Sequence, residues 1–187
     1  MELDGKTIAV LVEESYQELE VWYPLLRLRE AGAKTFTAGP LAGAIYKSKL
    51  GYPVKADRAV SDLSPTELDA VVIPGGWAPD YMRRHPSFVN LVREMNVLGK
   101  TIAAICHGGW LLCSAGVVRN RRATSFFSIK DDMVNAGARW VDEPVVVDGN
   151  LITSRIPDDL PDFCRALLEA LARAETAEPV AHAGARR

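Results

Sequence analysis

The chain has 187 residues, 48% of them hydrophobic, a mean hydropathy of +0.00 and a formal net charge of −2. This length suits one domain with its own core, and the composition is that of a soluble globular protein. The small net charge, without a basic stripe on any expected helix, argues against nucleic acid as a partner. No apolar run approaches the roughly 18 residues of a membrane span, and no secretion signal is expected.

The three cysteines, Cys106, Cys113 and Cys164, cannot all be paired, and none has the spacing of a zinc motif. This indicates a reducing, cytoplasmic compartment and neither structural zinc nor another metal. Cys113 lies two helical turns after Cys106, and Cys164 falls in an amphipathic segment, so both are expected to pack in the core. His85 is expected to be a solvated residue at a helix entry.

Apolar runs alternate with helical periods along the first half of the chain. We predict a strand over 6–12, a helix over 17–31 and a strand over 34–38, which together have the spacing of a βαβ unit. Residues 44–60 form short alternating pieces, which predict an antiparallel excursion at one sheet edge. A buried strand over 69–73 and a helix over 87–98 follow.

The second half begins with a strand over 101–105 and a helical pattern from residue 110. We predict a short strand over 123–127, a helix over 128–136 and a hairpin over 145–154, whose Asp-Gly pair indicates a type I′ turn. The last helix is expected over 157–174. The prediction is therefore one domain over 1–174 and a disordered tail over 175–187.

Strands that alternate with helices predict an open, mainly parallel sheet covered on both faces. Ligands of such sheets bind outside the carboxyl ends of the strands, where Gly75-Gly76 and Cys106 each follow a strand. Neither the glycine fingerprint of a dinucleotide site nor a Walker lysine is present. We therefore expect no nucleotide cofactor.

Cys106 stands where an apolar strand must turn directly into a helix. Gly108 and Gly109 follow it, and residues without a Cβ relieve the crowding of such a turn. The residue at the corner is then expected to be strained and exposed, with a pKa lowered by the helix start and by backbone donors. These features predict a nucleophile. The alternative is that Cys106 is a small buried hydrophobe at the end of a core strand.

Four segments resemble the PfpI-type intracellular protease family of the Parkinson-associated deglycase superfamily, which has the class I glutamine amidotransferase-like fold. They read AAICHG, IPGGWAPD, TSFFSIKDDMVNAGARWVD and VVVDGNLITSR, and the likeness extends over about 5–173. The resemblance implies a flavodoxin-like three-layer sandwich and a homo-oligomer built from dimers, a dimer or a hexamer. It also implies Cys106 as nucleophile, the His107 imidazole as base or orienting partner, and the N–H groups of Gly76 and His107 as the oxyanion hole.

Three positions depart from the family pattern. Asp80 stands where the family places a glutamate that reaches the histidine across a subunit interface; alternatively, Asp80 caps a helix. An alignment on Tyr23-Pro24 puts Gln17 at the place of the cysteine's acidic partner, where glutamine can donate a hydrogen bond but cannot transfer a proton. Of the nearby glutamates, only Glu20 is expected on the same helix face as Gln17. Phe126 replaces a tyrosine that is frequent in the family.

These residues predict a stress-related cysteine enzyme that acts on small reactive carbonyls, of glyoxalase or deglycase type. Proteolysis of peptides is the weaker enzymatic alternative. A glutamine amidotransferase is excluded, because the only downstream histidine, His182, does not belong to a His-x-Glu motif. The competing class is a non-enzymatic redox sensor or chaperone that uses oxidation of Cys106, an alternative that a proton carrier missing at Gln17 would favour.

Overall fold

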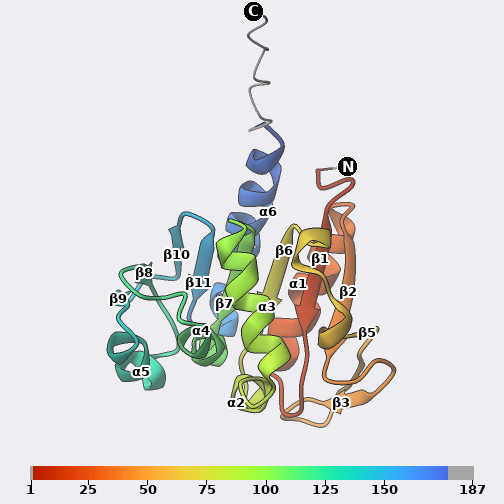
Figure 1. The fold of residues 1–187 in the computed structure, drawn as a ribbon, viewed down its shortest axis with the longest axis horizontal. Coiled ribbons are helices and arrows are strands. Elements are labelled where there is room, and N and C mark those ends of the chain that lie inside the picture. Colours follow the sequence, from red (N-terminus) through yellow and green to blue (C-terminus); the bar gives the residue numbers. More distant parts are fainter. Residues whose placement is uncertain (1, 177–187) are drawn as a thin grey trace, which may run out of the picture.

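A seven-stranded sheet runs through the middle of the computed structural model, which describes residues 2–176 (Figure 1). Neighbouring strands are parallel except in the hairpin formed by the last two. In spatial order the strands are β10 (Val145–Asp148), β11 (Leu151–Ser154), β7 (Thr101–Ile105), β6 (Ala70–Ile73), β1 (Thr7–Leu11), β2 (Lys34–Gly39) and β5 (Arg58–Ala59).

Helices cover both faces of this sheet (Figure 1). On one face, α1 (Glu18–Glu30) contacts α6 (Leu160–Thr176), and on the other α3 (Pro86–Val97) contacts α4 (Gly109–Ala115). Two short helices, α2 (Ala78–Met82) and α5 (Lys130–Asn135), contact α4. The predicted α/β sandwich with a mainly parallel sheet is confirmed. None of the described helices is both long and apolar enough to cross a membrane.

The central strands form because they are apolar on both faces. Every residue of β6 and β7 is buried, as are the last four residues of β1. Helices cover both sides of a parallel sheet, so such strands have continuous rather than alternating apolar sequences. Ile8 pairs with Ala70 and Val71 with Ile102, and this register aligns the carboxyl ends of the three strands.

Two segments fold differently from the prediction. Residues 44–60 do form an antiparallel excursion, but its strands β3 (Ile45–Lys47) and β4 (Pro53–Lys55) make a separate sheet, and only β5 joins the main one. The strand predicted over 123–127 is reduced to β8 (Arg122–Ala123), paired with β9 (Arg139–Trp140). Beyond it, the Phe126 N–H donates to the Cys106 carbonyl instead of to a neighbouring strand.

The hairpin β10–β11 is confirmed, but its turn is not type I′. That turn needs positive φ at both central residues, whereas only Gly149 has one, at 56°. Asn150, the second central residue, has no positive φ, and its side chain donates to the Lys100 carbonyl at 2.9 Å. At the C-terminus α6 extends to Thr176, two residues past the predicted end. The predicted tail otherwise lies outside the described residues.

The carboxyl ends of β1, β6, β7 and β11 meet at one rim of the sheet. Isolated bridges join Tyr16, which follows β1, to Gly76 beyond β6 and to Ser48 in the excursion. Gly75 lies against Cys106, the residue that follows β7, so the segments after β1, β6 and β7 meet at this rim.

Candidate active site

Cys106 occupies the predicted sharp turn and has a positive φ of 60°, a conformation that is strained for a residue with a Cβ. A Cβ on Gly108 would lie 2.8 Å from the Ile73 carbonyl oxygen, and one on Gly109 would lie 2.7 Å from Met133 Sδ. The two glycines therefore let the chain turn directly into α4. The thiol is not held out into solvent as expected, because Cys106 is only 8% exposed.

Glu20, in the first turn of α1, is the acidic neighbour of Cys106. The residue is 0% exposed, and its Oε2 accepts the Gly75 N–H at 2.6 Å. A Cβ on Gly75 would lie 2.7 Å from this oxygen and 2.6 Å from Cys106 Cβ, so only glycine leaves the two side chains room to meet. The carboxyl group interacts with the thiol, and burial raises its pKa to about 7.

Gln17 does not hold the position that the sequence alignment gave it. It is the residue before α1, and its Oε1 accepts the Glu20 N–H at 2.9 Å. This hydrogen bond caps the helix. Gln17 thus helps to orient Glu20, and Glu20 takes the place beside the cysteine that had been assigned to Gln17.

The thiol and this carboxyl group are electrostatically coupled. Burial and the Glu20 carboxylate raise the pKa of Cys106 to about 12, opposed by the backbone N–H groups of His107 and Gly76. The predicted fall of the Cys106 pKa is therefore wrong, because burial outweighs the backbone donors and the Glu20 carboxylate adds to its effect. Two ionisable groups this close titrate as a pair, and both the Glu20 carboxyl group and the Cys106 thiol hold their protons to higher pH than the free side chains do.

The imidazole of His107 connects the thiol to a third side chain. Its Nδ1 lies 3.3 Å from Cys106 Sγ, and its Nε2 lies 3.3 Å from Ser128 Oγ. Phe126 stacks on the ring at 4.9 Å and 28° between planes, and Trp110 meets it edge-on at 4.9 Å. Burial and the Lys49 charge lower the pKa of His107, so the ring is neutral at neutral pH and can accept a proton.

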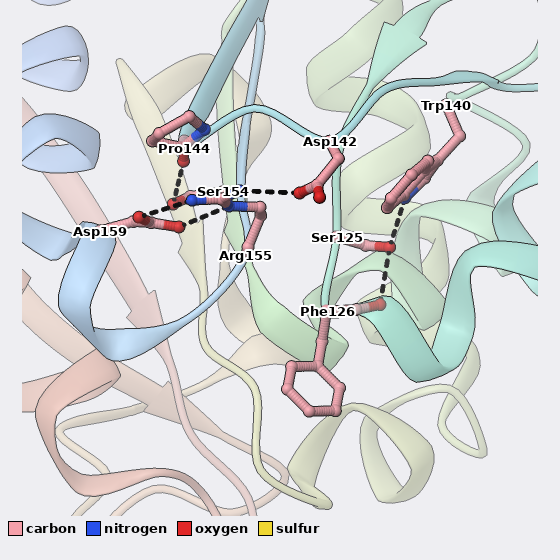
Figure 2. Close-up of polar contacts among 8 residues, drawn as sticks. All are labelled: Ser125, Phe126, Trp140, Asp142, Pro144, Ser154, Arg155 and Asp159. Carbon is pink, nitrogen blue, oxygen red and sulfur yellow. Dashed lines mark hydrogen bonds and ion pairs between the residues drawn. The ribbon is translucent and has the colours of Figure 1, made fainter.

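A polar network fixes the backbone of Phe126 at its carbonyl group (Figure 2). Ser125 Oγ accepts the Trp140 indole N–H at 3.0 Å and donates to the Phe126 carbonyl at 3.1 Å. Nearby, Arg155 pairs with Asp159 through Nε at 2.9 Å and with Asp142 at 2.7 Å. A cavity of about 200 Å³ beside Phe126 is lined by Ser125, Phe126, Phe127, Asp142, Arg155 and Ile156.

The two remaining predicted residues have different surroundings. Gly76 has a φ of +71°, and a Cβ there would lie 2.4 Å from the Ser15 carbonyl oxygen, so no other residue fits. Its N–H faces Cys106, as an oxyanion donor should. Asp80 lies in the first turn of α2, where it accepts no capping N–H and pairs with Arg84.

The structure thus brings together Cys106, His107, Gly76 and Glu20, and gives Gln17 and Asp80 other partners. Sequence reasoning gave Glu20 only a secondary place. Its spacing of three residues from Gln17 was the available signal, because both positions lie on one helix face. Ser128 was missed: it lies 21 residues after His107, in a segment read as a helix start. Of the cysteines expected in the core, Cys164 is buried and Cys113 partly so.

Known proteins are similar to this chain in sequence and in fold. The family model described as DJ-1/PfpI family matches residues 6–170. Deglycase PfpI of Pyrococcus furiosus is 42% identical over 164 residues, which are 88% of this chain and 98% of the relative. Protein/nucleic acid deglycase 2 of Escherichia coli is 42% identical over 169 residues, 89% and 98% of the two chains. The crystal structure of Drosophila melanogaster DJ-1beta superposes with a TM-score of 0.84 at 32% identity, covering 89% of this chain and 90% of that one.

Proposed function

The chain belongs to the DJ-1/PfpI family, and on this premise we propose that it is an enzyme whose Cys106 attacks small reactive carbonyl compounds, with deglycase or glyoxalase chemistry. The observation that carries the proposal is the position of the sulfur. Within the described chain, Cys106 has a neutral imidazole at 3.3 Å, a shared-proton carboxyl group and two backbone N–H groups around it.

In the proposed reaction, the sulfur attacks the carbonyl carbon of an aldehyde or 2-oxoaldehyde. The thiol proton moves to His107 or Glu20, a C–S bond forms, and the carbonyl π electrons pass to the oxygen. The N–H groups of Gly76 and His107 stabilise the developing oxyanion. Protonation of this oxygen gives a neutral hemithioacetal. Glu20 can carry this proton because its pKa of about 7 lets both protonation states occur at neutral pH.

The test is consumption of methylglyoxal by the wild type and by Cys106→Ser. Loss of the proposed nucleophile should cost more than loss of acid/base assistance, which is typically worth ~10²-fold or more. We therefore expect turnover to fall by at least ~10²-fold in the variant. Cys113→Ser is the matched control: its sulfur lies 3.5 Å from Met133 Sδ, outside the proposed site, and its turnover should be unchanged. Unimpaired consumption by Cys106→Ser would exclude the proposed function.

A redox sensor is now the weaker alternative. Oxidation and nucleophilic attack both need the thiolate, so the 8% exposure and raised pKa of Cys106 do not distinguish the two functions. The argument from a missing proton carrier disappears, because Glu20 stands where Gln17 had been placed. Proteolysis remains an alternative from the family resemblance, and assays on denatured casein, with and without Cys106, would distinguish it.

We further propose a homo-oligomer. An apolar groove of about 580 Å³ runs along α1, with Leu26, Leu50 and Tyr52 exposed on its walls. Exposed apolar surface of this kind is typical of protein interfaces. A second chain could bring its Asp80 to His107, as the family resemblance implies.

If Asp80 acts across such an interface, dilution should lower activity together with oligomer size. Asp80→Asn should then lower turnover without dissociating the oligomer, because the amide keeps the side-chain volume and loses the charge. Sedimentation velocity and methylglyoxal assays at matched concentrations measure the two quantities. A fully active monomer would contradict cross-subunit action.

A further inference from the structure

Ser128 meets the imidazole of His107 at the nitrogen that does not face the thiol. Its Oγ lies 3.3 Å from Nε2, while Nδ1 of the same ring lies 3.3 Å from Cys106 Sγ. We propose that Ser128 is a positioning residue that holds the His107 proton on Nε2 and so leaves Nδ1 free to accept the thiol proton. The inference deepens the proposed function and rests on it.

The chemistry requires one particular tautomer. Neutral imidazole carries a single N–H, and only an unprotonated Nδ1 can take the proton of Cys106. When this transfer occurs, the S–H bond breaks, an N–H bond forms at Nδ1, and the electron pair stays on sulfur. His107 is then an imidazolium with two N–H groups, of which Nε2–H still donates to Ser128 Oγ. As an acceptor, the Ser128 hydroxyl therefore suits both states of the ring, and the tautomer measurement below tests that it accepts from Nε2 instead of donating to it.

Ser128 can position the ring because its own segment is anchored at several points. It belongs to the 3-10 turn Phe127–Ile129, in which the Ile129 N–H donates to the Phe126 carbonyl at 3.2 Å. The same carbonyl accepts the Ser125 hydroxyl (Figure 2). The Phe126 N–H in turn donates to the Cys106 carbonyl at 3.2 Å, so the turn that carries Ser128 is fixed to the nucleophile's own backbone.

Ser128 acts within one chain, which separates it from the proposed role of Asp80. The Asp80 carboxylate pairs with Arg84 four residues further along α2. A contact between Asp80 and His107 would need a second chain and would weaken on dilution. The Ser128 contact is already present in the single chain, so its contribution should not depend on protein concentration.

The experiment compares Ser128→Ala, Ser128→Thr and the wild type in the full-length protein. Removing the hydroxyl should lower kcat for methylglyoxal about twofold to tenfold with little change in KM, as expected for one hydrogen bond that orients a catalytic group. Threonine retains a hydroxyl and should restore most of kcat. Ser61→Ala is the control, because this exposed serine donates to the neighbouring Asp62 and should leave kcat unchanged.

A second readout needs no turnover. The chain has three histidines, and ¹⁵N chemical shifts, assigned to His107 with a His107→Asn variant, report which ring nitrogen carries the proton. We expect an Nε2–H ring in the wild type and in Ser128→Thr, and a mixed tautomer population in Ser128→Ala. Unchanged shifts and kcat in Ser128→Ala would overturn the proposal, as would a loss of kcat that threonine does not restore. If Cys106→Ser proves fully active, the proposed function fails while the shifts still decide the tautomer.

Discussion

Replacing Glu20 by glutamine is expected to lower carbonyl turnover about 10²- to 10⁴-fold, the usual contribution of general acid/base catalysis. The amide can keep the geometry: its oxygen can accept the Gly75 N–H, and its NH₂ can take the place of Oε1, which has no hydrogen-bond partner among the described residues. The amide can no longer carry a proton.

The pH dependence should identify Glu20 as the cause. In the wild type, kcat/KM should rise with pH through about 7, where the Glu20–Cys106 pair loses its first proton and gains its single negative charge. This rise should be absent near pH 7 in Glu20→Gln. Measurements from pH 5 to 9 with methylglyoxal would show it, provided that the variant retains measurable turnover.

Glu18→Gln is the matched control on the same helix. The Glu18 carboxylate accepts the Leu50 N–H at 2.8 Å, and its charge makes the smallest of the named contributions to the raised pKa of Glu20. Turnover of Glu18→Gln should match the wild type, and its pH profile should keep the rise, displaced slightly to lower pH. If Glu20→Gln is as active as Glu18→Gln, Glu20 is not the proton carrier, and His107 would have to move every proton of the reaction.

The sequence predicted the main sheet well because its strands are marked by composition alone. Every residue of β6 and β7 is buried, and a continuous apolar run of four or five residues is typical of a strand in the interior of a parallel sheet. It predicted β8 poorly, because the backbone hydrogen bonds of 124–127 go to distant partners. The Thr124 N–H, for example, donates to Thr153 Oγ1, a tertiary contact without a local signal.

The part of the site that could be predicted is the sharp turn between β7 and α4. The strained turn at Cys106 was predicted from the two glycines that follow it, and the positive φ of 60° at Cys106 confirms it. The predicted acidic partner of Cys106 was wrong because its identity depends on how α1 presents its side chains. Gln17 and Glu20 are a turn apart, and the capping bond from Gln17 decides which of them points to the sulfur. That bond is visible only once the start of α1 is known.

The predicted low pKa of the thiol failed for an electrostatic reason. Backbone donors do lie beside Cys106, but burial outweighs them, and the adjacent carboxylate adds repulsion. Sequence can suggest the donors of a turn, whereas burial is a property of the whole fold. In the mechanism we propose, the Glu20–Cys106 pair carries one negative charge, and Cys106 becomes nucleophilic when Glu20 holds the shared proton.

Glu20→Gln is also expected to stabilise the folded protein, and the gain should grow with pH. Burial raises the pKa of Glu20 from 4.5 to about 7 in the folded state. Between these values the unfolded chain releases a proton that the folded chain keeps, so wild-type stability falls as pH rises through this window. The difference corresponds to about 3 kcal/mol at most. Glutamine does not ionise and avoids this cost.

Urea unfolding at pH 4 and pH 8 measures the effect. The free energy of unfolding of Glu20→Gln should exceed that of the wild type by about 1–3 kcal/mol at pH 8 and differ little at pH 4. Glu18→Gln should not show the gain, since burial does not raise the pKa of Glu18 overall. An equal difference at both pH values would mean that Glu20 is not held protonated by the fold. A variant that is more stable but nearly inactive would show that the buried carboxyl group is kept for its proton chemistry, because it weakens the structure that holds it.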